Sequence, residues 1–140
     1  MSFWFALLAA FFMGTAPAFA RVGLEKIEPL TALVIRSTSV TLILFIMLFF
    51  RQVFFPAQIS ITLPSAGYIA LEGFFGALLG HLAYYYALRM GEVSVVVPVM
   101  AVFPLIAFIY GLLLFNESIS PLKISGITAV VAGLIMLRMS

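Results

Sequence analysis

Cysteine and aspartate are both absent from the 140 residues of this chain, and histidine occurs once. Without cysteine there is no disulfide framework, no thiolate metal site and no thiol nucleophile. With one histidine and no aspartate, neither a metal-ligand cluster nor a Ser-His-Asp triad can be built within one chain. We therefore expect no enzymatic activity, no metal ion and no cofactor.

Charge is also scarce. Only 9% of the residues are charged and 65% are hydrophobic, whereas a soluble domain usually has about 25% charged and roughly 45–50% apolar residues. A soluble fold would have too few polar side chains for its surface, and a disordered chain would need far fewer apolar ones. The net charge of +2 comes from scattered residues, which leaves no basic cluster for nucleic acid. The composition predicts an integral membrane protein.

Long apolar stretches follow one another along the chain. A helix needs about 20 apolar residues to cross a hydrocarbon core of ~30 Å. We predict an all-α, polytopic membrane helix bundle in a single domain, residues 1–140, with five transmembrane helices: Phe3–Ala20, Leu30–Phe50, Ala66–Leu88, Val93–Phe115 and Pro121–Arg138. Ser120 is the expected N-cap of the fifth helix, with proline at its first position.

The first stretch ends in a small-x-small pattern, Ala18-Phe19-Ala20, as signal peptides do. Its start lacks the positive charge of a signal peptide, so we expect it to remain in the protein. Short loops that carry more lysine and arginine tend to lie on the cytoplasmic side of the membrane. Two of them, Arg51 and Lys123, fall on the side of the N-terminus, and four fall on the other: Arg21, Lys26, Arg89 and Arg138. Two against four favours a cytoplasmic C-terminus, with dual topology still open.

Small residues recur on single helix faces. The third stretch has them at spacings of 3, 4, 3 and 4, on one narrow face at about 100° per residue: Gly73, Gly76, Gly80, Ala83 and Ala87. The fifth stretch has Gly126 and Gly133 on one face. Because small residues let membrane helices approach closely, we expect helix packing at both faces.

Ionisable groups at membrane depth cost ~2.5–3.5 kcal/mol or more each, so they mark candidate functional sites. The candidates are Arg36, Glu72 and His81. Arg36 could instead reach the nearer interface. Glu72 could form a structural pair or lie at the interface, and His81 could face lipid or a neighbouring tyrosine. Glu72 and Tyr84 flank the face of small residues on opposite sides.

Helix-breaking residues are a further signal. Pro104 lies in the middle of the fourth stretch and Pro98 six residues earlier, while Gly14 and Pro17 interrupt the first. Proline frees a backbone carbonyl, and interrupted helices often mark transporter binding sites, although proline kinks also occur without such a role. Together these signals predict a solute pathway lined by Arg36, Glu72, His81, Tyr84 and Pro104.

Several short motifs occur in a fixed order. Gly14 follows an aromatic-rich start, and Thr31–Arg36 carries an arginine. Tyr85–Leu88 and Gly91–Ser94 flank the third connection, Pro104 precedes Glu117 by 13 residues, and Gly126 and Gly133 are seven apart. In this order and spacing the chain resembles the EamA-like transporters of the drug/metabolite transporter superfamily, almost from end to end.

The resemblance has implications for fold and function. Most members of this family have ten helices, built as two inverted five-helix repeats, and carry small metabolites, often amino acids or their relatives. This chain resembles one repeat, in a multi-pass protein of a prokaryotic plasma membrane. The resemblance implies a carrier that works by alternating access as a homodimer of antiparallel protomers or with a paralogous five-helix partner.

Two hypotheses add to this interpretation, and one competes with it. Glu72 is the candidate carboxylate for proton coupling. Arg36 and Glu72 lie about 9 Å from opposite membrane faces at 1.5 Å per residue, so an inverted copy would bring Arg36 to the depth of Glu72. This arrangement predicts a charge pair or shared site between protomers. The alternative function is a non-transporting membrane subunit of a larger complex. A four-helix multidrug exporter fits less well, since Phe3–Ala20 lacks the acidic residue of that group.

Overall fold

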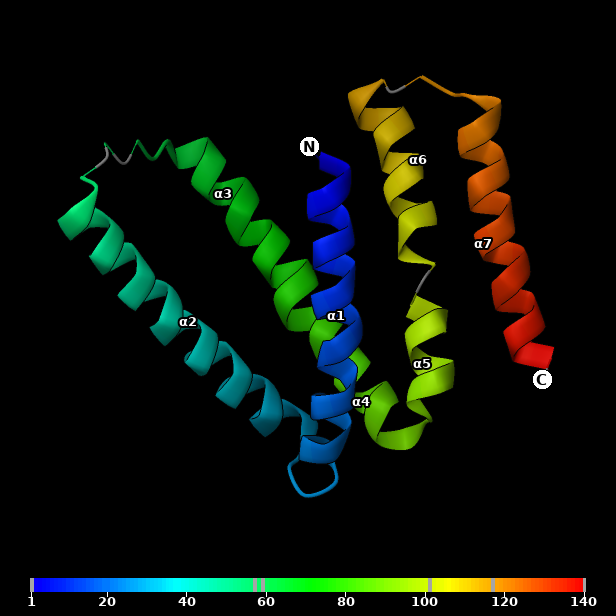
Figure 1. Cartoon of the computed structure of the whole chain (residues 1–140), viewed down its shortest axis with the longest axis horizontal. Helices are drawn as coiled ribbons and strands as arrows, with labels where there is room; N and C mark the ends of the chain where they lie inside the picture. Colours follow the sequence, from blue (N-terminus) through cyan, green and yellow to red (C-terminus); the bar gives the residue numbers. More distant parts are fainter. Residues whose placement is uncertain (1, 57, 59, 101, 117, 140) are drawn as a thin grey trace. The chain divides into compact units, whose positions relative to one another are not determined.

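The computed structural model describes residues 2–56, 58, 60–100, 102–116 and 118–139, with side chains from residue 3 to residue 136 within these ranges. All the regular secondary structure in this part of the chain is helical (Figure 1). The all-α prediction is therefore confirmed. The helices are α1 (Ser2–Leu24), α2 (Pro29–Phe54), α3 (Leu63–Glu72), the π-helix η1 (Gly73–Gly80), α4 (His81–Met90), α5 (Val93–Met100), α6 (Phe103–Phe115) and α7 (Pro121–Met139).

The helices fall in the five stretches expected from the sequence, and four of these stretches qualify as membrane spans. Four stretches are long and apolar enough to cross a membrane, namely Phe3–Leu24, Pro29–Phe54, Leu63–Met90 and Val93–Phe115, and α7 is apolar over Pro121–Met136. The third span begins at Leu63 rather than at Ala66, because Pro64 fits the first turn of α3, where no amide hydrogen is needed. At the start of α7, Ser120 Oγ accepts from the Lys123 amide at 3.2 Å, as expected of an N-cap.

The first span is not interrupted. Helix α1 runs continuously through Gly14 and Pro17, so the predicted break there is wrong. Membrane helices tolerate proline where other groups satisfy the backbone or the remaining hydrogen bonds hold the helix. Nearby, the Thr15 hydroxyl donates to the Phe11 carbonyl at 2.8 Å, which adds one such bond within the helix.

The fourth span is interrupted where Pro104 predicts it. Helix α5 ends at Met100 and α6 begins at Phe103, with Pro104 in its first turn. Across the junction the Val102 amide donates to the Val99 carbonyl at 3.3 Å and the Leu105 amide to the Val102 carbonyl at 2.9 Å. Pro98 lies inside α5. The break therefore follows from Pro104, the second of the two prolines.

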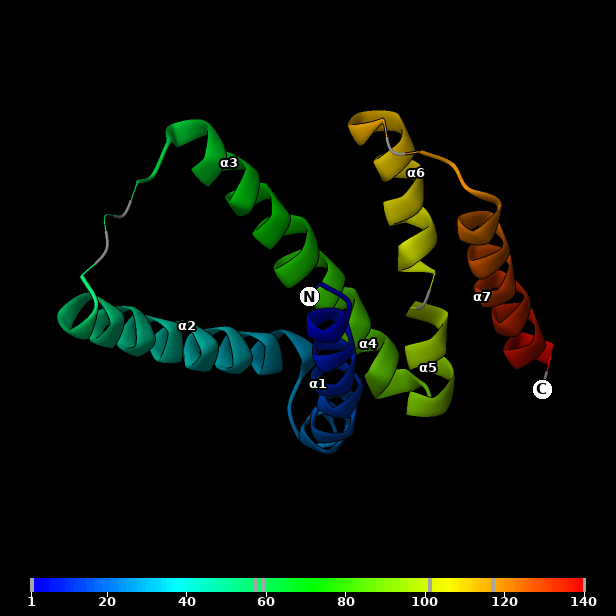
Figure 2. The same ribbon diagram turned by 45° about the horizontal axis from the view of Figure 1, so that its top comes forward.

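The chain divides into two compact units, residues 1–18 with 91–140 and residues 19–90. In the first unit α5 packs against α7. In the second, α2 packs against α4 near the turn between α1 and α2, and Figures 1 and 2 both show α2 and α3 running apart from there. Four buried apolar side chains form the core at this end: Leu24, Leu33, Tyr85 and Leu88. The single-domain prediction stays a prediction.

Most other large apolar side chains of the described helices are exposed, among them Phe45 and Phe49 on α2 and Leu113 and Leu114 on α6. In water such a surface would be unstable, but hydrocarbon is as apolar as leucine, so exposed leucine and phenylalanine carry no penalty in a bilayer. The distribution of apolar side chains therefore fits a chain that faces lipid over most of its length.

Candidate functional site

The middle of the third span is wound as a π-helix. Helix α3 ends at Glu72, η1 occupies the next eight residues, and α4 begins at His81. π-Helical winding is rare, occurs mostly as single-turn bulges, and is frequent at functional sites. Glycine is a poor helix former, and Gly73, Gly76 and Gly80 weaken the α-helical alternative here. The face of small residues was predicted from α-helical angles, which do not hold across η1.

Glu72 and His81, the two residues that bracket η1, both lie against Gly76. His81 Nδ1 is 2.8 Å from the Gly76 carbonyl oxygen. Glu72 Oε1 is 3.3 Å from the position that a β-carbon on Gly76 would occupy. In a regular α-helix, residues nine apart point in nearly opposite directions at about 100° per residue. The structure instead brings the membrane-depth carboxylate and the imidazole to the same glycine.

Tyr84 extends this group toward the end of the span. Its ring meets the His81 ring edge to face, with centroids 6.4 Å apart and planes at 85°. Tyr84 and His81 are half-buried, and Glu72 is exposed. Glu72 and His81 each lie against Gly76, and Tyr84 contacts His81. We call these three residues the π site.

Arg36 is not bonded to the π site. It is half-buried on α2 and, among the described residues, forms no hydrogen bond or ion pair with Glu72, His81 or Tyr84. Its place on a solute pathway stays a prediction.

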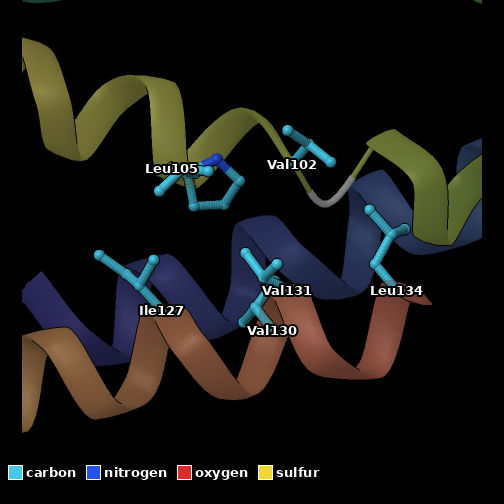
Figure 3. Close-up of a pocket in the computed structure, with 7 residues that line it drawn as sticks. Val102, Leu105, Ile127, Val130, Val131 and Leu134 are labelled. Carbon is cyan, nitrogen blue, oxygen red and sulfur yellow. The ribbon is translucent and has the colours of Figure 1, made fainter. Parts of the chain in front are cut away.

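Pro104 belongs to the other compact unit, where it lines a small apolar pocket of about 20 Å³ between the start of α6 and the face of α7. Val102 and Leu105 line it from one side, and Ile127, Val131 and Leu134 from the other (Figure 3). The pocket holds no charged side chain, so it can take only a small apolar group.

The remaining motif and packing residues differ in their surroundings. A β-carbon on Gly80 would lie 3.1 Å from the Phe75 carbonyl oxygen, so a larger residue here would press on the backbone of η1. A β-carbon at four of the others would meet nothing within 4 Å: Gly14, Gly73, Gly126 and Gly133. Ala83 is exposed and Ala87 is half-buried. Glu117 lies outside the described residues. Helix packing at these residues stays a prediction.

A polar cluster at the end of α4 was not predicted from the sequence. The Arg21 guanidinium donates to the carbonyls of Leu88 and Arg89, at 3.0 Å for Arg89. The last carbonyls of a helix have no partner within it, and basic side chains commonly satisfy them. Arg21 thus joins the end of α1 to the end of α4. The sequence pattern alone indicates only a loop charge beside a helix end.

Glu28 completes this cluster as the N-cap of α2. Its carboxylate accepts from the Thr31 amide and hydroxyl, each at 3.2 Å, and from the Tyr86 hydroxyl at 3.3 Å. Pro29 follows at the first helical position. Hydrogen bonds from the backbone amides of Leu30 and Thr31, assisted by both hydroxyls, hold the pKa of the Glu28 carboxyl below its usual value of 4.5.

The lowered pKa of Glu28 predicts a pH-dependent stability. Because the folded protein binds the proton more weakly than the unfolded chain, the stabilisation is complete above about pH 4.5 and is lost as the pH falls below it. Thermal unfolding in detergent should therefore show a Tm that declines below pH 4.5, less steeply in Glu28→Gln. Glu25→Gln, in the same turn, is the matched control and should follow the wild type. Equal slopes for Glu28→Gln and wild type would contradict this role.

No group of three or more histidine, aspartate or glutamate side chains that could hold a metal ion occurs among the residues that the structure describes. The side chains of the π site are a carboxylate, an imidazole and a phenol. These groups can form hydrogen bonds with a solute.

Comparison with known proteins agrees with the resemblance in sequence. The EamA-like transporter family matches residues 1–139. An uncharacterized protein of Methanocaldococcus jannaschii is 28% identical over 134 residues, which cover 96% of this chain and 93% of the relative. No solved structure matches the chain. The match to the family spans both compact units and every helix described above.

Proposed function

The chain belongs to the EamA-like transporter family, and on that basis we propose that it is a carrier for a small organic metabolite, coupled to protons. Members of this family are membrane transporters rather than enzymes. The carrier works by alternating access together with a second five-helix chain, either an antiparallel copy of itself or a paralogue.

The π site is the observation that supports this function best. A carboxylate and an imidazole each lie against Gly76, in the middle of an apolar stretch long enough to cross a membrane. An ionised carboxylate at membrane depth is costly, whereas a protonated one costs less, so Glu72 can exchange a proton as the site opens to either side. Helix irregularities near the middle of the membrane are where transporters bind solutes and coupling ions.

Transport by the protein alone separates this proposal from the alternative function, a non-transporting subunit. Thermal shift of the purified protein against the twenty amino acids, tested singly, selects the solute that raises Tm most. Counterflow of that radiolabelled amino acid into liposomes that contain only this protein should exceed protein-free liposomes several-fold. Absence of both the shift and the flux would contradict a carrier for amino acids, and one dominant co-purifying partner would then favour the subunit.

The dimer arrangement predicts a specific cross-link. In antiparallel protomers Arg36 of one copy reaches the depth of Glu72 of the other. The chain has no cysteine, so Arg36→Cys and Glu72→Cys chains with different tags give no background disulfides. Oxidation in membranes should yield a mixed-tag dimer, because a disulfide forms when α-carbons come within about 7 Å.

The matched control for this cross-link is Ser37→Cys paired with Glu72→Cys, since Ser37 is turned by about 100° from Arg36 on α2. It should cross-link much less. Two results would contradict the antiparallel contact between Arg36 and Glu72. In one, a chain that carries both cysteines forms only internal disulfides; in the other, the control pair cross-links as well as the Arg36→Cys and Glu72→Cys pair.

A further inference from the structure

The π-helix in the third span is longer than a single bulge, and its sequence alone does not account for it. Segments with i→i+5 hydrogen bonds are usually one turn long, while η1 covers eight residues. Apolar residues of η1 such as Leu78 and Leu79 are good α-helix formers, so they do not select the π-helix. Additional contacts within the span must therefore favour the π register.

His81 supplies such a contact through both of its donors. Its backbone amide donates to the Gly76 carbonyl, five residues back, and also to the Leu78 carbonyl. Its ring Nδ1 lies 2.8 Å from the same Gly76 oxygen. Since a carbonyl oxygen can only accept, Nδ1 carries the proton. An α-helix would instead direct the His81 amide to Ala77, four residues back.

The Gly76 carbonyl therefore receives two hydrogen bonds from one residue, and both favour the π register. A carbonyl oxygen has two lone pairs and can accommodate both donors. Lipid offers no competing partner for the ring N–H, so the bond is worth keeping in a bilayer. His81 is thus the residue best placed to hold the end of η1.

The other end of η1 connects this register to Glu72. Glu72 Oε1 lies 3.3 Å from the place of a Gly76 β-carbon, so the carboxylate rests on the same residue whose carbonyl His81 binds. A change from π to α winding would turn Gly76 and everything after it relative to α3. The surroundings of the Glu72 carboxylate would change with it.

We propose that His81 is a positioning residue of the carrier: its ring N–H holds the Gly76 carbonyl, which keeps η1 in the π register and sets the surroundings of Glu72. This role rests on the proposed function for its effect on transport, but its effect on helix winding is independent of any solute. It differs from direct solute binding by His81, which would require the imidazole itself.

Asparagine separates the two roles. Its side-chain amide nitrogen occupies the position of Nδ1 and donates as Nδ1 does, but it has no imidazole and does not titrate. His81→Asn should therefore retain the π register, and His81→Phe, with a ring of similar size and no donor, should lose it. If the imidazole itself binds solute, asparagine is not expected to restore transport.

Helix length reports the register directly. Tyr68 and Met90 flank η1 and are 74% and 80% exposed, so spin labels on Tyr68→Cys and Met90→Cys disturb little. In lipid nanodiscs, His81→Phe should lengthen the distance between labels by ~2–3 Å, since an α-helix rises 1.5 Å per residue and a π-helix rises less. The wild type and His81→Asn should share the shorter distance.

The outcomes for winding and for transport are distinguishable. The same distance between spin labels in the wild type, His81→Phe and His81→Asn would overturn the positioning role, whatever the solute flux. A longer distance in both variants would assign the effect to the imidazole and would also overturn it. If the distance between labels is longer in His81→Phe alone and the wild type shows no flux, the positioning role stands and the proposed function is contradicted.

Discussion

Glu72→Gln is expected to uncouple solute movement from protons. An imposed difference of one pH unit corresponds to about 1.4 kcal/mol per proton, so coupling to one proton sustains up to about tenfold accumulation of the solute. Glutamine keeps the size and shape of Glu72 over Gly76, but it cannot take up a proton. Accumulation in proteoliposomes should therefore fall from several-fold to none.

The same variant should keep exchange that needs no proton. Counterflow of labelled against unlabelled solute should continue in Glu72→Gln, because the site is neutral in every step. Glu25→Gln, in the turn after α1, is the matched control and should accumulate solute like the wild type. Full accumulation in Glu72→Gln would contradict the coupling role, and equal loss in Glu25→Gln would show that the effect does not belong to the π site.

Gly80→Ala is expected to be the most destabilising alanine substitution of a glycine in the third span. The new methyl group would lie 3.1 Å from the Phe75 carbonyl oxygen, which belongs to the backbone and cannot turn aside as a side chain can. Overpacking of this kind typically costs ~1–3 kcal/mol. Thermal unfolding in detergent should show a Tm several degrees lower, or a chain that leaves the π register.

Two other glycines of the same span serve as controls. Gly67 on α3 has nothing within 4 Å of its β-carbon position, so Gly67→Ala should leave Tm unchanged or raise it, since alanine is the better helix former. Gly76→Ala should be intermediate, because its methyl group would meet only the flexible end of Glu72. A Tm for Gly80→Ala equal to that of Gly67→Ala would contradict the close packing of η1.

Much of the architecture follows from elementary properties of the sequence. The five helical stretches, four of them long enough to span, could be predicted because a bilayer requires long apolar helices. The break at Pro104 could be predicted because proline lacks an amide hydrogen. The same rule failed at Pro17, where α1 continues unbroken. Whether a membrane helix breaks at proline depends on the other hydrogen bonds of the helix, which a residue pattern does not contain.

The π site could be predicted only in part. Glu72 and His81 stand out in the sequence as costly groups at membrane depth, but the angle between their side chains follows from the sequence only for an α-helix. The π winding changes that angle, and the glycines that allow it also fit an α-helical packing face. A pattern of small residues therefore predicts a special helix face without distinguishing close packing from altered winding.

The cluster at the end of α4 was missed for a different reason. Arg21 and Glu28 stand beside helix ends in the sequence, where charged residues usually meet water. Their partners, the Leu88 carbonyl and the Tyr86 hydroxyl, are about 60 residues away along the chain. Contacts between residues so far apart depend on how the helices pack, and no local motif reports them.

Accumulation of solute in liposomes that contain this chain and no other protein tests the proposed function most directly. The liposomes are loaded with buffer, a gradient of one pH unit is imposed, and uptake of the amino acid selected by thermal shift is followed with time. A coupled carrier built from copies of this chain should concentrate the solute severalfold, and a protonophore should abolish the gradient of solute. Uptake that stops at equal concentrations, with or without the protonophore, would contradict proton coupling, and no uptake at all would contradict a self-sufficient carrier for that amino acid.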